Sequence, residues 1–234
     1  MKQSTFSLYY FSIGILFIVL EHLHSFLPAL IVKALIIPAL MLYFYSRAKT
    51  SLTTFHRLIL LGLFFSWLGD ILLQFSNAGF ELCLDVQAWF MLGLAAYFIT
   101  QVTFSVAFSL QKGRNTIIGR RIYQVFIVAG YGFLLLWFLY NHLGDMKIPV
   151  IVYAAAILTM LTTALNRYGK VNGVSYMLVT IGALLFVFSD SMIAVNRFYE
   201  KIDFARIFIM ATYVTAQYLI AIGCLRQDFD SDTT

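Results

Sequence analysis

The stretch IGALLFVFSDSMIAVNRF, residues 181–198, is long and apolar enough to cross a lipid bilayer as a helix, yet it contains Asp190. An aspartate within a membrane span costs about 2.5–3.5 kcal/mol on insertion scales, so such a residue is a candidate functional residue. A second stretch, LGLFFSWLGDILLQF at residues 61–75, has the same form, with Asp70 in the matching place. We therefore expect the rest of the chain to be a scaffold that holds these two carboxylates together.

Composition places the chain in the class of polytopic membrane proteins. Of its 234 residues, 61% are hydrophobic and only 12% are charged, whereas a soluble domain is about 45–50% apolar and about 25% charged. The net charge of +5 does not indicate nucleic-acid binding, because the basic residues lie in short loops between the apolar stretches, where they indicate orientation in a membrane. The two cysteines form neither a disulfide framework nor a metal-type spacing, and we expect no metal or cofactor.

The expected fold is all-α, an eight-helix transmembrane bundle, because only helices satisfy their own backbone in lipid and the period-two alternation of a barrel is absent. Residues 1–226 form a single membrane domain, and residues 227–234 form a short acidic tail that we expect to be disordered. The predicted spans are 6–24, 27–46, 55–75, 87–109, 119–140, 148–166, 173–196 and 204–225.

The distribution of Lys and Arg predicts that both termini lie in the cytoplasm, because cytoplasmic loops carry the excess of basic residues. Five basic residues fall on the opposite side: Lys33, Lys147, Arg197, Lys201 and Arg206. The side of the N-terminus holds the other eleven of the 16 basic residues: Lys2, Arg47, Lys49, Arg57, Lys112, Arg114, Arg120, Arg121, Arg167, Lys170 and Arg226. We expect a multi-pass protein of a bacterial cell (inner) membrane.

This topology places the two acids at a similar depth. Asp70 is about 15 residues, roughly 22 Å, from the cytoplasmic end of its span, and Asp190 is about 17 residues, roughly 26 Å, from the same end. Lys33 enters from the opposite side and reaches a comparable level. At an offset of 120 residues, Asp70 falls on Asp190 and Gly62 falls on Gly182. A four-plus-four parallel duplication explains this match; a coincidence among apolar residues is the alternative.

Two carboxylates at one depth in a medium of low dielectric constant cannot easily both ionise, because burial and the neighbouring like charge both oppose ionisation. We therefore predict that Asp70 and Asp190 share one proton. That leaves one acid and one base, the arrangement that general acid–base hydrolysis uses. The alternative is structural, in which each aspartate caps a neighbouring helix or pairs with a buried base such as Lys33.

Other polar residues of the spans are candidates for substrate binding, because polar side chains are costly in lipid and face the bundle interior. Tyr213 and Gln217 are four residues apart and so share a helix face. Simpler alternatives are a bond to a backbone carbonyl for Ser189, snorkelling at the interface for Arg197, and packing for the tyrosines. The candidates are Lys33, Gln101, Tyr153, Ser189, Asn196, Arg197, Tyr213 and Gln217.

Two motifs, FSWLGDILL at residues 65–73 and LFVFSDSMIAVNRF at residues 185–198, resemble the two signature helices of the YhhN-like family, the lysoplasmalogenases. The resemblance extends over most of the chain and includes TYVTAQYLIA at residues 212–221. In that family the fourth span usually carries His followed three residues later by Tyr. Here those positions hold Gln101 and Phe104, which bears on substrate choice and on activity.

The resemblance implies an integral membrane hydrolase whose substrate is lysoplasmalogen, a vinyl-ether lysophospholipid. The products are a fatty aldehyde and glycerophosphocholine or glycerophosphoethanolamine, and the partners are this substrate and bilayer lipids. A vinyl ether hydrolyses by protonation at carbon, so one protonated aspartate would donate and the other, ionised, would stabilise the cation and deprotonate water. Lys33, Tyr213 and Gln217 would orient the headgroup or the ether oxygen.

Two other functions are compatible with the same acids. In a small transporter or channel, Asp70 and Asp190 would relay protons or bind a cation, and we would expect a pathway open at both membrane faces. A non-catalytic lipid-binding protein is the second alternative, and the departure at Gln101 favours it. A closed pocket with an apolar slot for an acyl chain would distinguish an enzyme from a transporter.

Overall fold

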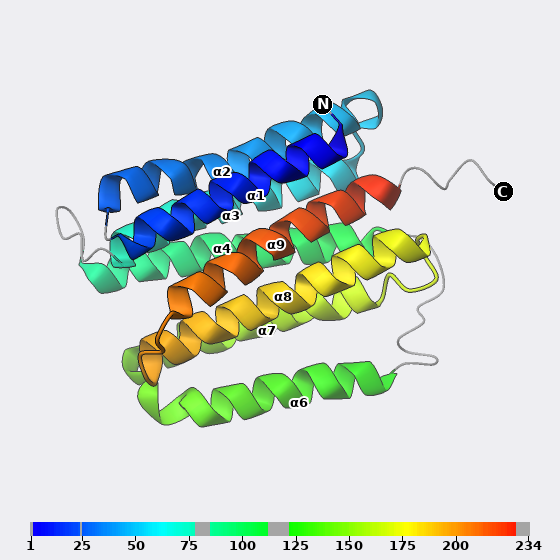
Figure 1. Ribbon diagram of the computed structural model, residues 1–234. Coiled ribbons are helices and arrows are strands. Elements are labelled where there is room, and N and C mark those ends of the chain that lie inside the picture. Colours follow the sequence, from blue (N-terminus) through cyan, green and yellow to red (C-terminus); the bar gives the residue numbers. More distant parts are fainter. Residues whose placement is uncertain (1, 24, 78–84, 112–121, 228–234) are drawn as a thin grey trace.

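The computed structural model describes residues 2–23, 25–77, 85–111 and 122–227, and within these ranges it contains helices and no strand (Figure 1). Several sequence expectations concern residues outside this part of the chain. They are the predicted end of the first span at 24, the predicted start of the fifth span at 119, the acidic tail at 228–234, Cys83, and the basic residues Lys112, Arg114, Arg120 and Arg121.

In the described part of the chain, eight helices are long and apolar enough to cross a membrane, and this confirms the predicted all-α bundle. The predicted boundaries that fall on described residues agree with the helix ends within three residues. Three short 3-10 segments, η1 (Lys49–Ser51), η2 (Tyr140–His142) and η3 (Gly144–Met146), lie between long helices. The long helices are α1 (Gln3–His22), α2 (Phe26–Ala48), α3 (Thr54–Asn77), α4 (Val86–Ser109), α6 (Ile122–Leu139), α7 (Lys147–Leu165), α8 (Gly173–Phe198) and α9 (Ala205–Arg226).

The helices run alternately up and down, so α1 begins and α9 ends at the same end of the bundle (Figure 1). We call this the termini end, and we call the opposite end, where α8 ends at Phe198 and α9 begins at Ala205, the open end. In Figure 1, α9 lies between α1–α3 on one side and α7–α8 on the other, and 13 of its 22 residues are buried. By contrast, α6 lies at the edge and buries only three of its 18 residues.

Glycines allow two neighbouring helix pairs to approach closely, as small residues commonly do in membrane bundles. A Cβ atom on Gly69 of α3 would lie 2.7 Å from the ring of Tyr97 on α4. A Cβ atom on Gly182 of α8 would lie 2.9 Å from the backbone carbonyl oxygen of Ala216 on α9. The first contact positions the Tyr97 ring beside the residue that precedes Asp70.

Pro38 inside α2 is accommodated by a bond from the neighbouring helix. A proline has no backbone N–H, so the carbonyl four residues earlier, that of Ala34, loses its helical donor. The indole Nε1 of Trp67 on α3 donates to this carbonyl oxygen at 2.9 Å. The bond ties α2 to α3 one residue away from Lys33, and it therefore helps to fix the level at which Lys33 meets α3.

The second half of the chain repeats the helix register of the first. Helices α6, α7, α8 and α9 begin at residues 122, 147, 173 and 205, which is 119, 121, 119 and 119 residues after α1, α2, α3 and α4 begin at residues 3, 26, 54 and 86. This agrees with the 120-residue offset that relates Asp70 to Asp190. A four-plus-four arrangement is therefore visible in the helix bounds, while its origin in a duplication stays a prediction.

Candidate functional site

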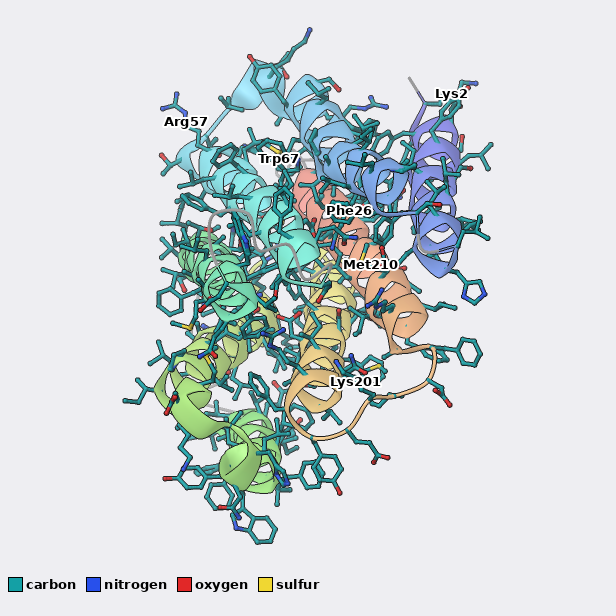
Figure 2. All side chains as sticks on the ribbon, turned by 90° about the vertical axis from the view of Figure 1, so that its left-hand side faces the viewer. Lys2, Phe26, Arg57, Trp67, Lys201 and Met210 are labelled. Carbon is teal, nitrogen blue, oxygen red and sulfur yellow. The ribbon has the colours of Figure 1, made fainter. Side chains whose placement is uncertain are left out.

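Asp70 and Asp190 line one cavity of about 260 Å³ at the open end of the bundle. Its walls come from α1, α2, α3, α4, α8 and α9 and from the loop between α8 and α9. Figure 2 views the bundle from this end and shows two lining residues, Lys201 in that loop and Met210 on α9. Two acids that are far apart in the sequence are therefore brought to a common space.

The Asp70 carboxyl group is only 2% exposed and is held by two phenol groups. Tyr97 on α4 donates to Oδ1 at 2.7 Å, and Tyr213 on α9 donates to Oδ2 at 2.8 Å. Behind them, Gln217 Nε2 donates to Ser66 Oγ at 2.6 Å, and Ser66 Oγ lies 2.7 Å from the Tyr213 hydroxyl. Both oxygens of Asp70 thus accept from phenol groups, and one of these, Tyr213, is itself held by Ser66 and Gln217.

The Asp190 carboxyl group has a simpler environment. Tyr153 on α7 donates a short hydrogen bond to Oδ2, and Gln101 Nε2 on α4 donates to the Tyr153 hydroxyl at 3.4 Å. Among the described residues no donor to Oδ1 is found. Asp190 also lines a second, narrower cavity of about 50 Å³, whose other lining side chains are apolar except for two tyrosines. They are Leu73, Phe90, Leu94, Tyr97, Val150, Tyr153, Ile193, Ala194 and Phe198.

A chain of polar contacts crosses the larger cavity from Lys33. The Lys33 ammonium group, 5% exposed, donates to Gln74 Oε1 at 3.2 Å, and Gln74 Nε2 donates to Glu21 Oε2 at 2.9 Å. Glu21 forms an ion pair with Arg206 at 2.8 Å. The contacts connect α2, α3, α1 and α9 at the open end, and they leave Lys33 without a carboxylate in hydrogen-bond contact.

Arg197 presents a second fixed cation to the same cavity. Its guanidinium group stacks over the ring of Phe90, with 3.8 Å between Cζ and the ring centroid, and Nη1 donates to Ser76 Oγ at 3.4 Å. With Lys33, Lys201 and Arg206, it gives this cavity four basic lining residues. Such a cluster suits a phosphate group, because arginine and lysine both bind phosphate oxygens strongly.

The termini end is packed around a buried arginine. Arg167 is fully buried, and its Nη2 donates to Ser175 Oγ at 3.0 Å and to Gln227 Oε1 at 2.8 Å. Its guanidinium group also lies 5.3 Å from the Phe108 ring centroid. Burial lowers the pKa of the Arg167 guanidinium from its ordinary value, because removal from water disfavours the charged form. No residue of this group lines the cavity that holds the two acids.

The structure brings seven of the ten predicted site residues to the larger cavity, one to the smaller cavity, and places two behind the lining residues. Ser189 lines the larger cavity but also donates to the Ile209 carbonyl oxygen at 3.1 Å, and Asn196 Oδ1 accepts from the backbone N–H of Ile202 at 2.9 Å. The larger cavity is lined by Lys33, Asp70, Ser189, Asp190, Asn196, Arg197 and Tyr213; Tyr153 lines the smaller one, and Gln101 and Gln217 lie behind.

The sequence analysis missed Tyr97, Gln74, Glu21 and Ser66. Residue counts do not single out Tyr97, because it lies eleven residues from the open end of α4 whereas Asp70 lies seven residues from the open end of α3. For metal binding, the described part of the chain offers no group of three or more His, Cys, Asp or Glu side chains.

Comparison with known proteins gives one family and several relatives. The model of the YhhN family matches residues 29–224. Lysoplasmalogenase TMEM86B of Sus scrofa is 31% identical over 144 residues, 61% of this chain and 57% of that protein. A lysoplasmalogenase of Mycobacterium tuberculosis (strain CDC 1551 / Oshkosh) is 30% identical over 161 residues, 67% of this chain and 59% of that protein. The chain therefore spans somewhat less than two thirds of the length of these relatives. No solved structure matches it.

Proposed function

The chain belongs to the YhhN family, and we propose that it is a membrane-embedded hydrolase that cleaves the vinyl-ether bond of lysoplasmalogen. The products are a fatty aldehyde and glycerophosphocholine or glycerophosphoethanolamine. Relatives about 30% identical to this chain carry the name lysoplasmalogenase. The observation that carries the proposal is the presence of Asp70 and Asp190 in the wall of one cavity.

The two cavities match the two ends of such a substrate. A lysoplasmalogen has a charged phosphodiester headgroup and a single apolar chain, and the vinyl ether joins the glycerol to that chain. The larger cavity carries four basic residues, and the narrower one is walled by apolar side chains. Asp190 lines both cavities, so a substrate with its headgroup in one and the start of its chain in the other places the reacting bond beside Asp190.

The reaction needs one protonated and one ionised carboxyl group. The acid transfers its proton to the alkene carbon farther from oxygen; the π electrons form the C–H bond, and an oxygen lone pair forms the oxocarbenium ion. Water attacks this ion while the second aspartate takes its proton, which gives a hemiacetal. The first aspartate then accepts the hemiacetal hydroxyl proton as the bond to the glycerol oxygen breaks, and the second returns its proton to that oxygen. Both groups regain their starting states.

The basic residues of the cavity would hold the phosphate group. Arg197 is fixed by its stack on Phe90, and Lys33 is held by Gln74, so both cations are positioned before substrate binds. Tyr213 would affect the reaction through the hydrogen bond that it donates to Asp70, and Gln217 donates to the Tyr213 hydroxyl. In the same way, Tyr153 donates to Asp190, and Gln101 donates to the Tyr153 hydroxyl.

Two observations favour hydrolysis over transport. The cavity that contains both acids reaches the open end, and its lining residues include none of those packed around Arg167 at the termini end. A transport pathway would need an opening at both ends. The narrow apolar cavity beside Asp190 also gives a position for a hydrocarbon chain, which a proton or cation pathway does not require.

The helix order also supports a location. Helix α1 begins and α9 ends on one side of the bundle, and the excess of Lys and Arg on that side supports a cytoplasmic position for it. We propose that the membrane is a bacterial inner membrane and that the open end of the cavity faces away from the cytoplasm. In this orientation the substrate is taken from the outer leaflet.

The test uses purified full-length protein in lipid nanodiscs with 1-alkenyl lysophosphatidylcholine and lysophosphatidylethanolamine. Aldehyde release is followed by mass spectrometry, and in D₂O the aldehyde should carry one deuterium on the carbon next to the carbonyl group. The saturated 1-alkyl and the 1-acyl lysophospholipids should not be cleaved. Binding of the alkenyl lipid without aldehyde release would instead indicate a non-catalytic lipid-binding protein.

A further inference from the structure

We infer that the two aspartates have different, fixed roles: Asp190 carries the proton that is delivered to the substrate, and Asp70 is the ionised partner. The inference rests on the proposed acid–base hydrolysis and assigns its two roles. It rests on the difference in charge between Lys33 and Tyr153, which occupy equivalent positions in the two halves of the fold.

The repeat relates the two acids and the residues opposite them. Asp70 is the seventeenth residue of α3 and Asp190 is the eighteenth residue of α8, and the two are 120 positions apart. The same offset relates Lys33 on α2 to Tyr153 on α7, which are the eighth and seventh residues of their helices. In each half, the helix before the acid therefore places one polar side chain toward the site: an ammonium group in the first half and a phenol in the second.

The difference in charge between these two residues separates the acids. Lys33 lines the same cavity as Asp70, and no carboxylate among the described residues is in hydrogen-bond contact with it. Its charge therefore favours an anion at Asp70. Tyr153 donates one neutral hydrogen bond to Asp190 and brings no charge. In a low-dielectric interior, a single cation is enough to decide which of two nearby carboxyl groups ionises.

Hydrogen bonding also favours an ionised Asp70 and a protonated Asp190. Asp70 accepts from Tyr97 and Tyr213, one on each oxygen, and hydrogen bonds donated to a carboxylate favour its ionised form. Within the described part of the chain, Asp190 accepts on Oδ2 alone, so Oδ1 is available to carry a proton. The second half of the fold has Gln217 at the position equivalent to Tyr97, and Gln217 donates to Ser66 and not to Asp190.

The other titratable and charged groups around the cavity do not change which of the two aspartates ionises first. Facing Asp70 are Tyr10 from α1, Lys33 from α2, Tyr97 from α4, Tyr213 from α9 and Asp190 itself from α8. Facing Asp190 are Tyr97 from α4, Tyr153 from α7 and Asp70 from α3. The tyrosines are neutral and add no charge to either site. Toward the entrance, Glu21 is neutralised by Arg206. Arg197 lies about two helical turns beyond Asp190 on α8, and Lys201 lies in the loop that follows this helix.

Infrared spectroscopy tests this without requiring turnover. The purified protein in nanodiscs is titrated in D₂O, and the carbonyl stretch of a protonated carboxyl group is followed in wild type, Asp70→Asn, Asp190→Asn and, as a control, the exposed Asp145→Asn. At neutral pH we expect one buried acid band, lost in Asp190→Asn and kept in the other two. In Lys33→Met a second acid band should develop at a higher pH than in wild type, because Asp70 has lost its cation. Tyr123→Phe, at an exposed tyrosine of α6, should leave the spectrum unchanged.

Loss of the band in Asp70→Asn instead, or no acid band at all at neutral pH, would overturn the assignment. These outcomes differ from failure of the proposed function, which is a wild-type protein that releases no aldehyde. Where turnover is observed, the pH profile of kcat/KM gives a second measure. Lys33→Met should shift only the limb at low pH, which reports the ionisation of Asp70. Tyr153→Phe should shift only the limb at high pH, which reports the loss of the proton from Asp190. The opposite pattern would contradict the assignment.

Discussion

The two aspartates differ in what surrounds them, but each is expected to be indispensable. General acid–base catalysis contributes about 10²–10⁴-fold to a rate. We predict that Asp70→Asn and Asp190→Asn each lower kcat by at least about 10²-fold. An amide retains the size of the carboxyl group and can still accept from Tyr97, Tyr213 or Tyr153, so the thermal unfolding midpoint in detergent should change little. The control is Asp145→Asn, whose side chain is exposed and does not line the cavity. Near-normal aldehyde release by both cavity variants would refute the catalytic assignment.

Arg197 is expected to act in binding and not in the chemical step. Its guanidinium group is held by Phe90 and Ser76 on the cavity wall, and a hydrogen bond to a charged group contributes about 1.5–3 kcal/mol. Arg197→Gln should therefore raise KM for lysoplasmalogen about tenfold or more with kcat changed much less, because the lost contact is present in both ground and transition states.

Arg47 provides the matched control for that measurement. It also lies against an aromatic ring, that of Tyr43, at 5.4 Å, but it is in the last turn of α2 at the termini end. Arg47→Gln should leave KM unchanged. If both variants raise KM equally, the effect comes from loss of surface charge and not from a headgroup site at Arg197.

Among the helices, the contact between α3 and α4 determines whether Asp70 keeps both of its donors. Gly69→Ala would place a Cβ atom 2.7 Å from the Tyr97 ring, so the ring must shift away from Asp70 or the helices must separate. Overpacking of this kind costs about 1–3 kcal/mol. We predict a lower unfolding midpoint and a kcat/KM reduced about tenfold or more, measured on the purified variant.

Gly130 on α6 tests whether any helix glycine has this effect. A Cβ atom there meets nothing within 4 Å, and alanine is favoured over glycine in a helix by about 1 kcal/mol. Gly130→Ala should therefore keep full activity and an unfolding midpoint that is equal or higher. Equal losses in Gly69→Ala and Gly130→Ala would show that the close approach of Tyr97 is not what positions Asp70.

The helices themselves were predictable, because about 20 consecutive apolar residues have essentially one stable conformation in lipid. Depth could also be predicted from residue counts, and this brought Asp70, Asp190 and Lys33 to one level. Which side chains meet is a different matter, because it depends on helix rotation and spacing. Tyr97 was missed for this reason: its contact with Asp70 follows from the close approach at Gly69, and a tyrosine within a span gives no sign of that in the sequence.

The same limit explains the placement of Gln101 and Gln217. Both were predicted to bind substrate, since amides are costly in lipid and must face inward. They do face inward and are fully buried, but each donates to another protein side chain, Gln101 to Tyr153 and Gln217 to Ser66. Polarity predicts burial in the bundle; it does not distinguish a residue that lines a cavity from one that supports the residues lining it.

For the whole molecule, the orientation in the membrane decides which leaflet supplies the substrate. The even number of spans puts both termini on one side and the open end of the cavity on the other. Lys201 is exposed at the open end, and Lys49 is exposed in η1 at the termini end. Single cysteines at these two positions, in a Cys83→Ser background that leaves only the buried Cys224, report the two sides separately.

We predict that a membrane-impermeant maleimide labels Lys201→Cys in intact spheroplasts, whereas Lys49→Cys is labelled only after permeabilisation. The physical reason is the excess of Lys and Arg on the side of the termini, which disfavours translocation of those loops. Added lysoplasmalogen should protect Lys201→Cys from the reagent and leave Lys49→Cys unaffected, because only Lys201 lines the cavity. The reverse labelling pattern would place the open end in the cytoplasm, and the substrate would then come from the inner leaflet.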